Sequence, residues 1–271
     1  MGSELAFPIL MKSHNKLWLL ALLYFFALSG ALSQAIDSQS EGDLKERIQG
    51  DIGVAVYSQN NFTQSGESST QILPYAYFDY DRFFARIDTF GFKTIPLGMG
   101  YLEIVGRYNQ EGFTPKSSPY SLLNPRNLPV PLGLGTFQLT PFGAFFIYGF
   151  NDFNASKGGK MAEFTYAAEV KLPLSINIYP LIGFDYKDKK YVNYFYGVTP
   201  AESQVTGLSA YTSNGGISPY AALALEVPLG PNWVINSYFK HKWLAPAITN
   251  SPLVSDRHVD NFFISLDRHF E

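Results

Sequence analysis

Residues 159–172, GKMAEFTYAAEVKL, alternate apolar and polar side chains along their whole length. A period of two is typical of an extended strand whose two faces meet different surroundings. The segment is also long enough for a tilted strand to cross a membrane, which takes about 9–11 residues. It therefore predicts a membrane strand with an apolar face, made of Ala162, Phe164, Tyr166, Ala168, Val170 and Leu172, and a mainly polar face, made of Glu163, Thr165, Ala167, Glu169 and Lys171.

The same alternation recurs in the segments 82–90, 98–109, 175–186 and 262–270. In the first of these, the pattern assigns Phe83, Ala85, Ile87 and Thr89 to the apolar face. A soluble β-sandwich also shows such alternation, because one face of each sheet is buried and the other is wet. Strand length and the aromatic residues near strand ends, such as Trp233, Trp243 and Phe270, favour a membrane barrel over a sandwich.

The composition excludes several other classes of protein. The 271 residues include 46% apolar and 16% charged residues, with no cysteine and a formal net charge of −3. Soluble domains carry roughly 25% charged residues, so this chain is poor in charge. The apolar and aromatic content argues against disorder, and the lack of basic excess argues against a nucleic-acid partner. Without cysteine, neither a disulfide scaffold nor a cysteine-based metal site can form.

An export signal is predicted at the N-terminus. Residues 17–28, LWLLALLYFFAL, form an apolar run that follows Lys12 and Lys16 and precedes several small residues. This order is typical of a secretory signal, and the run is shorter than the roughly 20 residues of a transmembrane helix. We expect a cleaved signal peptide over 1–35, cut after Ser33 or Ala35, and one outer-membrane barrel domain over 36–271. An uncleaved anchor is the alternative.

The expected fold is all-β, a single antiparallel up-and-down transmembrane β-barrel of about ten strands. Ten is an even number, as single-chain bacterial barrels require. The expected strands span 50–57, 71–80, 82–92, 98–109, 136–150, 159–172, 175–190, 215–228, 231–244 and 257–270. Twelve strands are the alternative if the proline-rich segment 110–135 contains two more. With ten strands, this long segment falls among the short periplasmic turns, where it could form a ledge or enter the lumen.

Charged residues on the polar faces are expected to line the lumen. The two signs are nearly balanced, so they could pair across a narrow interior, where unpaired charges are costly. The positive set is Arg82, Arg86, Arg107, Lys171, Lys240 and Lys242, and the negative set is Asp88, Glu103, Glu163, Glu169, Asp185, Glu226 and Asp267. Structural ion pairs are therefore expected, with a small selective pore as the alternative.

One group of residues could carry catalysis at the barrel rim. His258 lies between Asp256 and Asp260 in the sequence and follows Ser251, so a Ser/His/Asp arrangement is conceivable. We expect solvated charge there instead. His241 is expected at the membrane interface, and His269 near the periplasmic end. No metal-ligand spacing or nucleotide motif occurs, so we predict no catalytic, cofactor-binding or metal-binding residue.

The C-terminal third resembles the MltA-interacting protein (MipA/OmpV) family of Gram-negative outer-membrane proteins. The resemblance rests on the ordered set Tyr194-Phe195-Tyr196-Gly197-Val198, Ala201, Ser203, Gly207-Leu208, Tyr211, Gly215-Gly216, Trp233 and Ser251-Pro252-Leu253-Val254. Gly133-Leu134-Gly135 also matches the middle segment of the family. The chain departs from the family pattern at Thr206, where the family commonly has serine, and at its end, which is His-Phe-Glu instead of Tyr-x-Phe.

This resemblance implies a non-enzymatic barrel in the bacterial outer membrane. It implies outer-membrane lipid as surroundings, and a periplasmic murein hydrolase or synthase as a partner that the barrel scaffolds. Other members of the family are described as surface adhesins or small-solute passages, so an adhesin or a small passive channel is the alternative. The partner, the solute and the oligomeric state stay open.

Overall fold

A computed structural model describes residues 44–64, 69–109, 111, 118–153 and 158–271. The signal peptide predicted over 1–35 lies outside these residues. The strands are β1 (Lys45–Gln59), β2 (Ser69–Asp81), β3 (Phe83–Arg86), β4 (Thr89–Leu97), β5 (Gly100–Arg107), β6 (Pro131–Thr140), β7 (Gly143–Asp152), β8 (Lys160–Ala167), β9 (Val170–Lys171), β10 (Asn177–Asp188), β11 (Gly215–Pro228), β12 (Trp233–Trp243) and β13 (His258–Phe270). The helices are η2 (Tyr120–Leu122), η4 (Pro173–Ser175), α2 (Lys189–Tyr196), α3 (Pro200–Thr206) and α4 (Pro246–Thr249).

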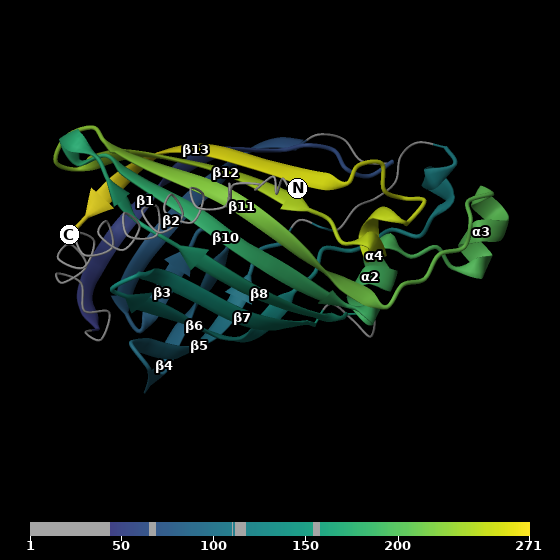
Figure 1. The fold of residues 1–271 in the computed structure, drawn as a ribbon, viewed down its shortest axis with the longest axis horizontal. Coiled ribbons are helices and arrows are strands. Elements are labelled where there is room, and N and C mark those ends of the chain that lie inside the picture. The colour runs from purple at the N-terminus through teal and green to yellow at the C-terminus, as the bar shows by residue number, and fades with distance from the viewer. Residues whose placement is uncertain (1–43, 65–68, 110, 112–117, 154–157) are drawn as a thin grey trace, which may run out of the picture. The chain divides into compact units, whose positions relative to one another are not determined.

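The described strands form one closed antiparallel sheet (Figure 1). Each strand pairs with the next along the chain, and the ring closes where β1 pairs with β13, from Gly50↔Phe270 to Gln59↔Asn261. Strands β8 and β9 both pair with β10, so β9 continues β8 and the thirteen labelled strands make a barrel of twelve. The predicted all-β antiparallel barrel is confirmed. It has twelve strands, which was the stated alternative to ten.

The two faces of the wall follow the alternation in the sequence. On β13, Phe262, Ile264 and Leu266 are 43–51% exposed on the outer face, whereas Ser265 and Asp267 are buried inside. The other strands repeat this arrangement, and large apolar side chains therefore cover the outside of the barrel, where hydrocarbon replaces water. Within the described residues, no helix is long and apolar enough to cross a membrane.

The expectation of ten strands was wrong because two segments taken as single strands are hairpins. Segment 82–92 contains β3 and β4, joined by a two-residue turn at Ile87 and Asp88. Ile87 has φ 62°, a left-handed conformation that β-branched residues rarely adopt, so the sequence carries no turn signal there. The turn shifts the alternation, and Thr89 lies buried inside the barrel instead of on the outer face.

The second missed hairpin joins β6 and β7. Its two-residue turn is Pro141-Phe142, between the paired residues Thr140 and Gly143. The first half of β6 was not predicted because glycine, which is unusual in strands, occupies its alternate positions Gly133 and Gly135. A side chain at Gly133 would place its Cβ 1.9 Å from the carbonyl oxygen of Gly149, so the close approach of β7 requires glycine there.

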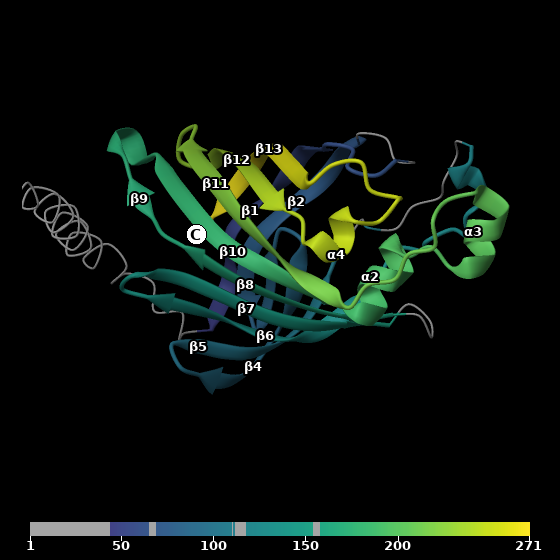
Figure 2. The same ribbon diagram turned by 45° about the vertical axis from the view of Figure 1, so that its right-hand side comes forward.

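Twelve strands also correct the expected position of segment 110–135. The described part of this segment contains η2 and the start of β6, and it does not contain two further strands. Because 82–92 is a hairpin, one more strand precedes this segment, and it connects β5 to β6 at the same end as the connections β1–β2, β7–β8, β10–β11 and β12–β13. We call this end, which also carries α2, α3 and α4, the long-loop end (Figures 1 and 2).

The opposite end carries only tight connections, and we call it the short-turn end. Its turns lie at 82, 98–99, 141–142, 172–176 and 229–232. Bacterial outer-membrane barrels have short periplasmic turns and longer extracellular loops. By this rule the short-turn end faces the periplasm and the long-loop end faces outward.

Candidate functional site

The centre of the lumen is crossed by ion pairs between strands that are not neighbours. Arg107 on β5 pairs with Glu163 on β8, whose other carboxylate oxygen accepts a hydrogen bond from Tyr220 Oη on β11 at 2.7 Å. Lys242 on β12 pairs with Asp185 on β10 at 2.6 Å. Through Glu163 these contacts link β5, β8 and β11, and the second pair spans β11 from β10 to β12. The expectation of paired lumen charges is confirmed for these residues.

A second charged group lies inside the wall formed by β2–β7. The carboxylate of Asp79 contacts Lys93 Nζ at 2.8 Å and Arg86 Nη2 at 3.2 Å. Nearby, Glu103 is 1% exposed and accepts a hydrogen bond from Tyr148 Oη at 3.0 Å. Asp79 and Lys93 were absent from the predicted lumen set, because each lies close to a turn where the face of the strand was not assigned.

Helix α2 fills the lumen at the long-loop end. The chain leaves β10 at Asp188, whose Oδ1 accepts a hydrogen bond from the backbone N–H of Tyr191 at 2.8 Å and caps the helix. The apolar face of the helix carries Tyr191, Val192, Phe195 and Tyr196, each at most 2% exposed. Burying a large apolar side chain stabilises a fold by about 1.5–3 kcal/mol. The helix therefore acts as a plug held by packing.

The plug is also tied to charged residues of the wall. Tyr191 Oη donates a hydrogen bond to Glu111 at 2.5 Å, and the other carboxylate oxygen of Glu111 pairs with Lys187 on β10. On the opposite side, Phe195 and Tyr196 belong to one apolar cluster with Ile248 of α4. The long-loop end is therefore closed by both apolar and ionic contacts.

A small cap built around α3 stands beyond the plug. Thr199 caps α3 and forms a capping box with Glu202, and Gly207 ends the helix with φ 74°. Glu202 also pairs with Arg126 at 2.9 Å, and both residues are buried. Although burial opposes the charged form, hydrogen bonds from Thr199 and Arg126 lower the pKa of Glu202 to about 2.

The plug and the cap were not predicted, although the sequence contains a signal for each of them. Asp188 precedes apolar residues at helical spacing, and Thr199-Pro200-Ala201-Glu202 is a capping-box pattern. Both signals are short and follow a long strand pattern, so the segment was taken as the end of a strand and a loop. The partner of Glu202, Arg126, lies 76 residues away and has no local signal.

The residues considered for rim catalysis are only partly brought together. His258 Nδ1 lies 3.0 Å from Asp256, and His241 Nδ1 lies 2.5 Å from Asp260, with the two imidazole rings stacked at 5.0 Å. Ser251 is buried, and its Oγ donates to the backbone carbonyl of Tyr196 at 2.6 Å. The hydroxyl therefore has a structural role in the plug.

Two histidines outside the considered catalytic group, His269 and His241, lie on the wall of the barrel. His269 Nδ1 lies 2.7 Å from Asp51, its register partner across the β1–β13 seam, close to the short-turn end. His241 faces outward beside Trp243, with ring centroids 4.6 Å apart, as expected of an interfacial residue. In the described part of the chain, no group of three or more acidic or histidine side chains is arranged to hold a metal ion.

The short-turn end presents apolar side chains at the tips of its turns. Leu174 is 86% exposed, Phe142 is 69% exposed and Leu229 is 53% exposed. Each belongs to a tight turn, where polar residues, glycine and proline are usual. This end therefore differs from the buried, packed long-loop end, and it offers apolar groups to whatever adjoins it.

Comparison with known proteins agrees with this architecture. YiaT of Escherichia coli (strain K12), which is named as an outer membrane protein, is 22% identical over 214 residues, covering 78% of this chain and 86% of YiaT. The MltA-interacting protein of the same strain is 29% identical over 79 residues, covering 29% of this chain and 32% of that protein.

A third relative is the outer membrane protein Omp26La of Vibrio anguillarum, 29% identical over 80 residues, which are 30% of this chain and 31% of that protein. With the barrel, these relatives identify the chain as an outer-membrane protein. The family model "MltA-interacting protein MipA" matches residues 52–270, which include nearly the whole barrel. The chain therefore belongs to the MipA family.

Proposed function

We propose that this protein is a non-enzymatic scaffold of the outer membrane that binds a periplasmic murein hydrolase or synthase. Support comes from the family, and from a relative whose name describes it as interacting with MltA. That relative matches only over 79 residues, so the partner of this chain is inferred by analogy.

The observation that carries the proposal is the contrast between an occupied lumen and the exposed apolar turn tips of the short-turn end. The Arg107–Glu163 and Lys242–Asp185 pairs cross the interior, and α2 fills its long-loop end. The interior is therefore used for structural contacts. Ser251, considered as a nucleophile, is buried and hydrogen-bonded to Tyr196. These features favour binding over transport and over catalysis.

A periplasmic partner would reach the protein at the short-turn end. We infer that it contacts the apolar turn tips Phe142, Leu174 and Leu229, since exposed apolar groups often belong to interaction sites. Segment 110–135, for which a periplasmic ledge was one of the possibilities left open, lies at the other end and is therefore excluded from this docking surface.

The test is recovery of cell-wall enzymes with the tagged, folded protein from cross-linked, detergent-solubilised membranes. We expect the double variant Phe142→Ser/Leu174→Ser to lower recovery of a murein enzyme at least fivefold. The matched control is Leu122→Ser/Val205→Ser, which removes two residues that are 57% and 60% exposed at the long-loop end. Unchanged recovery with the turn variant, or an equal loss with the control, would contradict the proposal.

The channel alternative has its own measurement. The plug formed by α2 leads us to expect no steady conductance when the folded protein is placed in a planar bilayer. Steady conductance of the wild-type protein would favour the small passive channel. The adhesin alternative would instead depend on the cap, so loss of surface attachment in the Leu122→Ser/Val205→Ser variant would support it.

A further inference from the structure

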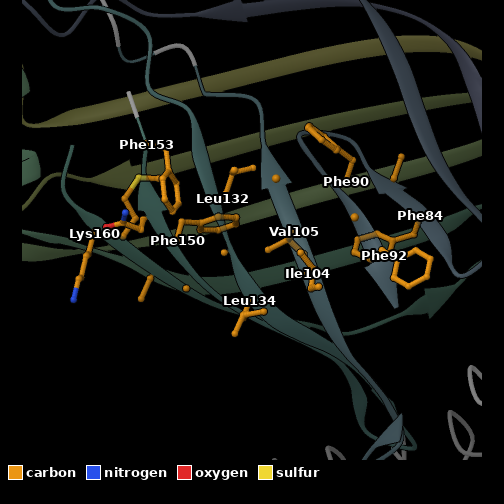
Figure 3. Close-up of a pocket in the computed structure, with 18 of the residues that line it drawn as sticks. Phe84, Phe90, Phe92, Ile104, Val105, Leu132, Leu134, Phe150, Phe153 and Lys160 are labelled. Atoms are coloured by element: carbon orange, nitrogen blue, oxygen red, sulfur yellow. The ribbon is translucent and has the colours of Figure 1, made fainter. Parts of the chain in front are cut away.

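A groove with a volume of about 1060 Å³ lies on the outer face of the wall, across β3–β8 (Figure 3). Its lining is almost entirely apolar. Phe90, Ile104, Leu132 and Leu134 line it and are 47–55% exposed, which places them on the lipid-facing side. The groove is therefore separate from the lumen, and one edge of it lies at the long-loop end of the barrel.

Small residues between large ones create the depression. Gly106 lies between Phe90 and Leu132 in register, and Gly149 lies between Leu134 and Ala162. A Cβ built on Gly149 would meet no atom nearer than 4.0 Å, so nothing within the wall fills this space. The missing side chain of Gly149 leaves a hollow, whereas the ring of Phe90 and the side chain of Leu132 fill the space above Gly106.

One edge of the groove is polar. Lys160 and Asn151 form a register pair on β8 and β7, next to the long-loop end, and both side chains are exposed. Figure 3 shows Lys160 at the edge of the pocket, on the opposite side from Phe90 and Phe92. The groove thus combines a long apolar surface with a single cation near the level where lipid headgroups begin.

We propose that this groove binds one acyl chain of an anionic, phosphate-bearing membrane lipid, whose phosphate contacts Lys160. The apolar lining matches a hydrocarbon chain, and the ammonium of Lys160 complements the negative phosphate. A second copy of the barrel is the competing occupant, and a dimer in place of bound lipid is the outcome that would favour it. The groove would therefore bind one lipid molecule more tightly than the rest of the outer face binds the lipids around the barrel.

Native mass spectrometry of the detergent-purified full chain tests this proposal, with phosphatidylglycerol and phosphatidylcholine of identical acyl chains as probes. We expect the wild-type protein to retain one phosphatidylglycerol at least fivefold more than phosphatidylcholine. Gly149→Trp fills the hollow and should abolish retention of both lipids. Lys160→Gln should keep a weak bound lipid but remove the preference for the anionic headgroup.

A matched control uses a small outward residue on the far part of the wall. Ala221 on β11 pairs with Ile182 and His241 and lies outside the groove, so Ala221→Trp should leave lipid retention unchanged. Equal retention by wild type, Gly149→Trp and Lys160→Gln would overturn the proposal, as would a dimer in place of bound lipid. Heat-dependent gel migration verifies that each variant is folded, and Lys160→Gln decides the question if Gly149→Trp does not fold.

Discussion

The two ends of this barrel are built on different principles. At the long-loop end, α2, α4 and the cap bury aromatic side chains and a salt bridge, so the connections form a small core of their own. At the short-turn end, the strands are joined almost directly, and apolar tips such as Leu174 stay exposed. Packing and charge therefore stabilise one end, whereas the backbone hydrogen bonds of the sheet hold the other.

The largest expected effect is removal of a plug side chain. Phe195 is 0% exposed, and Phe→Ala changes in cores cost about 3–5 kcal/mol. Phe195→Ala should destabilise the long-loop end by that amount, measured by hydrogen exchange of the α2 amides. Phe142→Ala at the other end should change stability by less than about 0.5 kcal/mol. Similar effects of both variants would mean that the two ends do not differ as described.

The next effect comes from the ion pair in the cap. Arg126→Ala leaves the buried carboxylate of Glu202 without its cation, and breaking a buried pair costs about 3–5 kcal/mol. We expect Arg126→Ala to destabilise the cap by about 3 kcal/mol, the lower end of this range, because Thr199 still hydrogen-bonds Glu202. Limited proteolysis within 207–214 should be faster in this variant and unchanged in Arg257→Ala, an exposed arginine. Equal proteolysis rates in Arg126→Ala and the wild type would contradict this.

Acid should weaken the same cap without any mutation. The folded-state pKa of Glu202, about 2, is below its ordinary value of 4.5, so the carboxylate stabilises the cap above about pH 4.5. That contribution is lost as the pH falls toward 2, and the loss amounts to about 2 kcal/mol at pH 3. Proteolysis by an acid-active protease should accelerate from pH 4.5 to pH 3 in the wild type. Glu202→Gln should remove this dependence, and its persistence there would assign it to another group.

The smallest effect is expected at the short-turn end. Leu174 has φ 64° and ψ 25°, a left-handed conformation that costs a non-glycine residue about 1–2 kcal/mol. Leu174→Gly should stabilise the barrel by at most about 1 kcal/mol, because glycine also loses more entropy on folding. The urea midpoint of refolding into detergent micelles measures this. A decrease in the midpoint would show that the Leu174 side chain makes a stabilising contact.

The barrel could be predicted from the sequence because apolar residues that face lipid alternate with mainly polar residues that face the lumen along each strand. That signal is strong where one unbroken strand crosses the membrane, as in 262–270 of β13. It fails at Ile87-Asp88 and Pro141-Phe142, where a two-residue turn divides a segment that is rich in aromatic residues on both sides. The first of these missed hairpins lies upstream of segment 110–135 and reversed the expected position of that segment.

The functional regions were harder to predict because they depend on contacts between distant residues. Arg126 with Glu202, Tyr191 with Glu111, and Ser251 with Tyr196 each join segments more than 50 positions apart. No local pattern encodes such pairs. The outer groove is equally hidden, because Gly106 and Gly149 are neighbours of large residues only once the strands are in register.

The seam between β1 and β13 has a consequence for how the wall closes. Its two strands come from opposite ends of the described chain, so their pairing is the contact of greatest sequence separation in the sheet. Until β13 pairs with it, β1 lacks one neighbour, and its edge is open to strands of other chains. A barrel without β13 would keep two open edges, which hydrocarbon does not tolerate. Pairing of β13 with β1 is thus the step that makes the wall compatible with a membrane.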